Sequence, residues 1–197
     1  MKFLEFFKEF INYPRITGAI APSSDRLSEL ITNIADLSKA HSVIEFGPGT
    51  GVFTEKILKK IPKQASFIAI ESNANFVAAT KLRCPQATIC HDNAIHAKKI
   101  LKIHGMSHCD CIISGLPWAS FNKQLQSQLL STVFDILRPG GKFLTFAYLQ
   151  GLLLPGGMNF RGKIQSYFPK VTTTKPVWLN TPPALVYCAQ KECNTIK

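Results

Sequence analysis

Acidic residues are scarce in this sequence. Its 197 residues include 12 Asp and Glu against 23 Lys and Arg, which gives a formal net charge of +11 at pH 7. Such an excess is typical of proteins that meet an anionic partner, either nucleic acid or an acidic membrane surface. It does not indicate disorder, because 46% of the residues are hydrophobic and only 18% are charged. Length and composition predict one ordered α/β domain with a sizeable core.

Metal and disulfide patterns are missing as well. No pair among the six cysteines has C-x-x-C or Cys/His zinc spacing, which predicts reduced thiols and no metal ion. The cysteines are Cys84, Cys90, Cys109, Cys111, Cys188 and Cys193.

Long hydrophobic runs are also absent. The longest, residues 143–154, is too short to span a bilayer and contains Gln150 and Gly151. The N-terminal residues do not resemble a secretory signal, because Glu5 and other charged residues interrupt them. We therefore expect a cytoplasmic protein without a transmembrane segment.

Glycine, by contrast, is concentrated at one point. An apolar run with β-branched residues ends at Glu45-Phe46, and Gly47, Gly49 and Gly51 follow immediately. A helical pattern then begins, so the sequence predicts strand, glycine turn and helix. Such a turn lets the backbone approach a ligand, and the helix N-terminus offers free N–H groups. A carboxylate at Glu45 would repel a pyrophosphate but attract a ligand with an ammonium group.

A second acid follows at the interval expected for a nucleotide-binding fold. The next apolar run, residues 65–70, ends in Glu71, where an acid would hydrogen-bond ribose hydroxyls. An ammonium-bearing ligand with a free ribose points to S-adenosylmethionine. The segment E-F-G-P-G-T-G at residues 45–51, with Glu71 downstream, also resembles the cofactor site of class I methyltransferases.

The remaining pattern alternates helices and strands. Helices are expected over residues 25–38, 73–83, 94–104, 123–137 and 159–168, with a further helix after the glycine turn. Strands are expected over residues 87–90, 109–113, 142–148, 171–178 and 184–190, in addition to the two strands above. This order predicts a single doubly wound, Rossmann-like methyltransferase domain. Its seven-stranded sheet is expected to be mostly parallel, with a C-terminal antiparallel hairpin.

Ligands of such sheets bind beyond the carboxyl ends of the strands. The methyltransferase resemblance implies that Asp92 accepts a hydrogen bond from the adenine amino group. The cofactor-binding residues are expected to be Glu45, Gly47, Pro48, Gly49, Thr50, Gly51, Glu71, Ser72, Asp92, Asn93 and Ala94. The cofactor would be S-adenosyl-L-methionine, released as S-adenosyl-L-homocysteine.

The fourth strand ends in the expected catalytic segment. Residues Ser114, Gly115, Leu116, Pro117 and Trp118 lie where amino-methylating relatives carry Asn/Asp-Pro-Pro-Tyr or Asn-Leu-Pro-Tyr. Carbonyl groups around a proline-rigidified turn can orient an amine, and the Trp118 ring can face the developing cation. Gly115 lacks the side-chain amide that nucleobase amino-methylases use, which favours an aliphatic amine over adenine.

Segments outside the cofactor site resemble the soluble bacterial phosphatidylethanolamine N-methyltransferases. These segments are I-T-G-A-I-A-P-S-S at residues 16–24, L-R-P-G-G-K at 137–142 and V-W-L-N-T-P-P-A-L-V-Y at 177–187. The resemblance implies methylation of a phospholipid or other aminolipid headgroup amine, with the conversion of phosphatidylethanolamine to phosphatidylcholine as the expected reaction. The alternatives are an rRNA adenine N6-dimethyltransferase, in which case nucleic acid is the partner, and a non-catalytic cofactor-binding adaptor.

The N-terminal segment of the chain is expected to contact the membrane. Residues 2–12 form an amphipathic pattern with six apolar side chains on one arc, which fits an interfacial helix or a helix docked on the core. We expect residues 1–40 to form this helix plus a cap or lid helix, and residues 41–197 to form the core. Lysines 56, 59, 60, 63, 98, 99 and 102 are candidate basic patches. The expected enzyme is a monomer associated peripherally with the inner face of the cell membrane.

Overall fold

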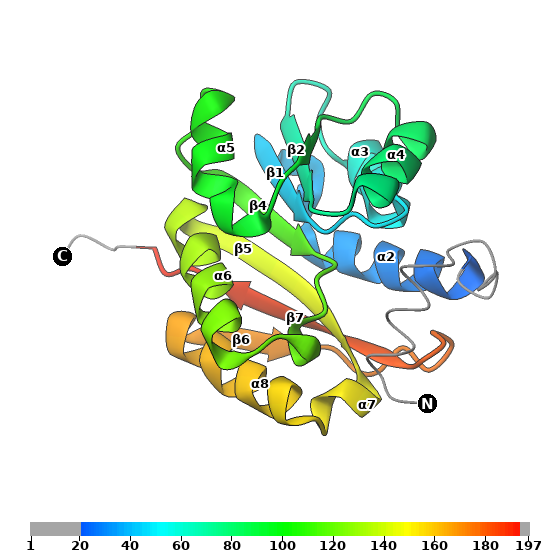
Figure 1. The fold of residues 1–197 in the computed structure, drawn as a ribbon, viewed down its shortest axis with the longest axis vertical. Helices are drawn as coiled ribbons and strands as arrows, with labels where there is room; N and C mark the ends of the chain where they lie inside the picture. The colour runs from blue at the N-terminus through cyan, green and yellow to red at the C-terminus, as the bar shows by residue number, and fades with distance from the viewer. Residues whose placement is uncertain (1–20, 194–197) are drawn as a thin grey trace.

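The computed structural model describes residues 21–193. Within this range, seven strands form one sheet in the order β3-β2-β1-β4-β5-β7-β6 (Figure 1). Strands β1 to β5 pair in parallel, whereas β7 is antiparallel to both β5 and β6. The predicted doubly wound sheet with a closing antiparallel hairpin is confirmed.

The elements alternate along the chain as predicted. The strands are β1 (Ser42–Phe46), β2 (Ser66–Glu71), β3 (Ile89–His91), β4 (Cys109–Ser114), β5 (Leu137–Tyr148), β6 (Lys170–Thr173) and β7 (Ala184–Gln190). The α-helices are α2 (Ala21–Ala35), α3 (Val52–Lys60), α4 (Ala74–Arg83), α5 (Ala97–Ile103), α6 (Lys123–Ile136), α7 (Leu149–Leu152) and α8 (Pro155–Tyr167). Short 3-10 turns are η1 (Leu37–Lys39), η2 (Ala94–His96) and η3 (Trp118–Ser120).

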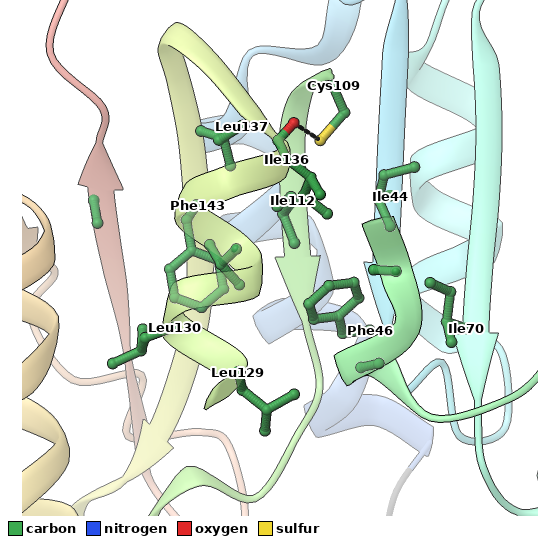
Figure 2. Packing of buried hydrophobic residues seen from close by; sticks show 14 of the residues in the cluster. Ile44, Phe46, Ile70, Cys109, Ile112, Leu129, Leu130, Ile136, Leu137 and Phe143 are labelled. Atoms are coloured by element: carbon green, nitrogen blue, oxygen red, sulfur yellow. Dashed lines mark hydrogen bonds between the residues drawn. The ribbon is translucent and has the colours of Figure 1, made fainter. Parts of the chain in front are cut away.

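The central strands are buried on both faces, as parallel strands must be when helices cover the sheet. Side chains alternate between two clusters, because successive residues of a strand point to opposite faces. Ile44 and Ile112 belong to the cluster under α5, α6 and α8, whereas Val43 and Ile113 belong to the one under α2 and α3. Figure 2 shows the first cluster, where Phe46 and Phe143 lie beneath residues of α6.

Helix α2 belongs to this layered body. Leu27 and Ile31 are buried against the sheet, and Lys142 Nζ donates to the carbonyl groups of Ile34 and Ala35 at the helix end. Helix α2 therefore packs as one layer on the sheet, and its expected role as a cap or lid helix stays a prediction. The predicted helix over residues 2–12 lies outside the described residues.

Several predicted boundaries are wrong, each for a local reason. Helix α2 ends at Ala35 because Asp36 is left-handed (φ 53°). Helix α8 begins at Pro155, a residue suited to the first helical turn, and is preceded by the unpredicted α7. Strand β6 ends at Thr173, because Pro176 has no N–H to donate to a ladder. In the second half of the strand predicted over residues 171–178, the pairing with β7 is an isolated bridge between Val177 and Ala184.

No helix among the described residues is both long enough and apolar enough to cross a membrane.

Candidate active site

Four neighbouring strands end at one edge of the sheet, and backbone hydrogen bonds join their ends. Gly47 N donates to Ile70 O at 2.9 Å, Asp92 N to Glu71 O at 3.0 Å, and Gly115 N to Phe46 O at 2.7 Å. The predicted site residues after β1, β2, β3 and β4 are thereby brought into one row. Because the order is β3-β2-β1-β4, the glycine turn lies at the centre of this row.

The glycine turn has the backbone that its sequence requires. Gly47, Gly49 and Gly51 all have positive φ, at 68°, 60° and 81°. Gly51 N donates to Pro48 O at 3.0 Å, which closes the turn around Thr50. A Cβ atom at Gly49 would meet nothing within 4 Å, so open space lies beside the turn.

Glu71 connects the end of β2 to this turn. Its Oε2 accepts from Gly49 N at 3.2 Å, its Oε1 accepts from Asn73 N at 2.9 Å, and the side chain is buried. On the other side of the turn, Thr80 Oγ1 of α4 donates to Gly49 O at 2.8 Å. Sequence reasoning missed Thr80, since a threonine within an amphipathic helix carries no signal of its own.

Glu45 is more deeply buried than its sequence position suggested. It is 1% exposed, and its Oε2 accepts a hydrogen bond from Thr54 Oγ1 at 2.6 Å. Its Oε1 is buried without a partner among the described residues. Burial, aided by the nearby Glu71 carboxylate, raises the pKa of Glu45 to about 8. Glu45 is therefore chiefly a neutral acid at pH 7 in this arrangement, and its attraction of an ammonium group stays a prediction.

Asp92 lies at the outer end of the row. Its Oδ1 accepts from Asn93 N at 2.6 Å and lies 2.8 Å from His96 Nδ1. The His96 contact, followed by the Asn93 amide, lowers the pKa of Asp92. Asn93 Oδ1 accepts from Ile95 N at 3.0 Å, which makes Asn93 the cap of η2 and leaves Ala94 buried beneath it.

Ser72 follows Glu71 as an exposed residue at the same edge. Its carbonyl oxygen lies 3.2 Å from His91 Nε2 at the end of β3.

The catalytic segment lies directly against the glycine turn. A Cβ atom at Gly115 would lie 2.5 Å from Gly47 O, and one at Gly47 would lie 2.9 Å from Leu116 Cδ2. Position 115 therefore needs glycine for the two turns to make this contact, whereas position 47 needs glycine for its positive φ. The absence of a side chain at Gly115 is thus a packing requirement, which sequence reasoning read only as a missing amide.

Trp118 does not present an open ring. It is 3% exposed, its indole stacks on Phe160 at 4.6 Å between centroids, and its Nε1 donates to Ser114 Oγ at 3.2 Å. Phe143 and Phe121 meet it edge-on. The expectation that the ring faces a substrate cation is wrong in this arrangement, and Trp118 forms part of the pocket wall.

A buried glutamine, missed by sequence reasoning, holds the segment in place. Gln126 of α6 is fully buried and donates through Nε2 to Trp118 O at 2.8 Å and to Gly156 O at 2.9 Å. Its Oε1 accepts from Asn159 of α8. One side chain thus joins the catalytic segment to α8. The only signal in the sequence is a glutamine on the apolar side of a helix.

A narrow apolar pocket opens beside this segment, with an internal volume of about 30 Å³. Residues 115–119 form one side of it, and the end of β5, α7 and the start of α8 form the other. Phe146, Tyr148, Leu152 and Phe160 supply most of the opposing surface. Burial raises the pKa of the Tyr148 phenol, which favours its neutral form. The pocket has room for a few atoms next to the glycine turn.

The lysines of α3 and α5, predicted as basic patches, do not lie on one surface. Lys56 and Lys60 of α3 pair with Glu29 of α2, and Lys59 pairs with Glu55. The lysines of α5 lie over the opposite face of the sheet, as the two core clusters show. Most of the charge on α3 is therefore neutralised, and the two groups cannot contact one flat surface together.

These features fit the expected cofactor. An ammonium group at the end of β1 would meet the carboxyl groups of Glu45 and Glu71 and favour the ionised form of Glu45. Glu71 would also lie where ribose hydroxyls can reach it, and the open side of Gly49 leaves room for the rest. Among the described residues, no group of His, Cys, Asp and Glu could hold a metal ion.

Comparison with known proteins agrees with this site. A family model described as a methyltransferase domain matches residues 43–141. The ornithine lipid N-methyltransferase of Singulisphaera acidiphila is 28% identical over 144 residues, which cover 72% of this chain and 75% of that protein.

Solved structures share the fold. The O-methyltransferase TomG of Streptomyces achromogenes, in complex with SAM, superposes with a TM-score of 0.67 at 14% identity, over 94% of this chain and 88% of that one. The O-methyltransferase of Bacillus cereus in complex with SAH gives 0.67 at 13% identity, over 95% and 90%. The family match, the glycine turn and these neighbours lead to one conclusion: the chain belongs to the methyltransferase domain family and is an S-adenosylmethionine-dependent methyltransferase.

Proposed function

We propose that this enzyme transfers a methyl group to the primary amine of a membrane aminolipid, with phosphatidylethanolamine, the precursor of phosphatidylcholine, as one such substrate. The observation that carries the proposal is the narrow apolar pocket lined in part by Gly115 and Leu116, which lie next to Gly47 of the glycine turn. Its small volume suits the end of an aliphatic chain better than a planar base. The similarity to an ornithine lipid N-methyltransferase supports the same class of acceptor.

The pocket also offers a reason for the amine to react. An alkylammonium ion loses its hydration on entering apolar surroundings, and desolvation lowers its pKa. The walls formed by Leu116, Phe146 and Phe160 would therefore favour the neutral, nucleophilic amine. The proton would leave to solvent before the amine nitrogen attacks.

The catalytic segment would orient that amine. A carbonyl oxygen can accept two hydrogen bonds, and the carbonyl groups of Leu116 and Pro117 each use one within the turn, to Trp118 N and Ser120 N. Bound S-adenosylmethionine would supply an electrophilic methyl group and a neutral thioether as the leaving group. Gln126 holds the turn in this position from beneath.

We further propose that the enzyme works as a monomer at the cytoplasmic face of the cell membrane. Residues 2–12 are a proposed contact, on the basis of their amphipathic pattern. The exposed lysines Lys99 and Lys102 of α5 are a second one, whereas the ion pairs of α3 weaken that helix as a candidate.

The test offers methyl-labelled S-adenosylmethionine with three acceptors in parallel. These are vesicles containing phosphatidylethanolamine, vesicles containing ornithine lipid, and undermodified rRNA. We expect label in one or both lipids and none in RNA. A preparation of Glu71→Ala serves as the control, because label that persists unchanged there comes from a contaminating enzyme. Label in RNA alone would refute the proposal and favour the adenine methylase.

A further inference from the structure

Four exposed apolar side chains belong to segments that line the acceptor pocket or pair with its lining residues. Leu153 follows α7 and is 80% exposed, and Met158 of α8 is 60% exposed. Each is adjacent in sequence to a residue that lines the pocket, Leu152 and Gly157 respectively. Trp178 and Leu179, in the connection between β6 and β7, are 70% and 68% exposed. We call these four residues the mouth surface.

Backbone pairing places Trp178 and Leu179 at the same edge as the pocket. Val177 forms a bridge with Ala184, and Ala184 pairs with Tyr148, which lines the pocket. Leu149 N also donates to Pro183 O at 2.9 Å, which ties the connection to the start of α7. Val177 thus pairs with β7, and β7 pairs with β5. These pairings bring the exposed indole of Trp178 toward the pocket mouth.

Hydrogen bonds of Asn180 fix the turn that exposes Trp178 and Leu179. Asn180 is buried, its N donates to Val177 O at 3.1 Å, and its Nδ2 donates to Pro182 O at 2.6 Å. The neighbouring Trp178 and Leu179 are held outward by this turn. Large apolar side chains in such a position forfeit burial, which indicates a surface that meets a partner.

The charge around the mouth surface specifies the partner. Residues 136–191 contain no Asp or Glu but seven Lys and Arg. Arg161 of α8 and Lys175 beside the Trp178 turn are exposed and have no ion pair among the described residues. A surface with large apolar tips flanked by the cations Arg161 and Lys175 complements a bilayer with anionic headgroups, and tryptophan is well suited to the interface between headgroup and acyl chain.

We infer that the mouth surface docks on an anionic lipid bilayer and holds the acceptor pocket at the level of the headgroups. This inference rests on the proposed function, because the pocket is assigned there to an aminolipid. Docking at the mouth lets a headgroup amine enter without the lipid leaving the membrane. The contact is distinct from residues 2–12 and from the lysines of α3 and α5.

The test uses Trp178→Ser with Leu179→Ser and a control, Leu82→Ser. The control removes an apolar side chain that is 84% exposed but lies on α4, which is none of the proposed membrane contacts. Both are compared with the full-length wild type by sedimentation with vesicles of phosphatidylethanolamine and phosphatidylglycerol. We expect the Trp178/Leu179 variant to bind at least about tenfold more weakly, because two large apolar side chains no longer enter the bilayer. The control should bind like the wild type.

Melting temperature and activity complete the test. The Trp178/Leu179 variant should melt within about 2 °C of the wild type, since both side chains are exposed, in line with the small stability effects of surface substitutions. It should also methylate dihexanoyl phosphatidylethanolamine, supplied below its micelle concentration, at the wild-type rate.

Unchanged sedimentation, or an equal loss in the control, overturns the inference. A large drop in melting temperature does so too, because the pair would then be covered within the protein. A wild type that binds vesicles through these residues but methylates no aminolipid refutes the proposed function, while the docking surface stands. Charge reversal by Arg161→Glu with Lys175→Glu gives a second variant, expected to lose binding to anionic vesicles.

Discussion

At the scale of single residues, Glu45 has the most unusual environment in the site. Its carboxyl group is buried beneath the glycine turn and accepts one hydrogen bond, from Thr54. Because the folded pKa of Glu45 is about 8 and its unperturbed value is 4.5, the folded state holds a proton that the unfolded state releases between these values. The free energy of unfolding should therefore fall as pH rises through this range, by up to about 1.4 kcal/mol per pH unit.

Denaturant unfolding between pH 5 and pH 9 checks this. The wild type is expected to lose stability toward the upper end of the range, and Glu45→Gln should flatten the slope, since its amide cannot ionise. Saturating S-adenosylmethionine should also flatten the slope, because a cationic ligand favours the ionised carboxyl group. Identical slopes for the wild type and Glu45→Gln would contradict the burial of this acid.

At the scale of elements, the contact between two turns decides the geometry of the site. The turn after β4 reaches the turn after β1 because Gly115 has no Cβ atom. Gly115→Ala would place a carbon about 2.5 Å from Gly47 O, so the two turns must separate. We expect a loss of about 1–3 kcal/mol in stability, typical of an overpacked site, together with weaker cofactor binding.

A matched control is available in α8. A Cβ atom at Gly162 would meet nothing within 4 Å, so Gly162→Ala should be neutral or stabilise the helix by about 0.5–1 kcal/mol. Thermal melting and calorimetric titration of both variants measure the difference. Equal behaviour of the two alanine variants would show that the turns are not in close contact.

The order of elements was predictable from sequence, and the way their ends are fixed was not. Alternating apolar runs and the glycine turn predict the sheet, because period and turn chemistry are local properties. The positions of Gln126 and Trp118 depend on α8, which lies about thirty to forty residues further along the chain. Likewise, the lysines of α3 looked like a free patch because their partner Glu29 belongs to another helix. Contacts between distant elements leave no periodic signal.

At the scale of the whole molecule, cofactor binding should stabilise the folded state by linkage. A ligand present at about 100 times its Kd adds about 2.7 kcal/mol, which corresponds to roughly 5–10 °C in melting temperature for a domain of this size. Glu71→Ala should reduce this shift, because losing charge-assisted hydrogen bonds costs on the order of 1.5–3 kcal/mol each. Titration of the melting temperature with S-adenosylmethionine and with S-adenosylhomocysteine measures both effects. An equal shift in wild type and variant would remove Glu71 from the cofactor site.

The contact between Gly115 and Gly47 also limits how this enzyme could diversify. A Cβ atom at position 115 meets the Gly47 carbonyl at once. A new side chain there, such as an amide that could hold a different acceptor, therefore cannot be introduced first. The glycine turn or β4 would have to shift beforehand, in a step that adds no new group to the site. The two turns can change only in this order, and the order restricts which acceptors single substitutions could reach.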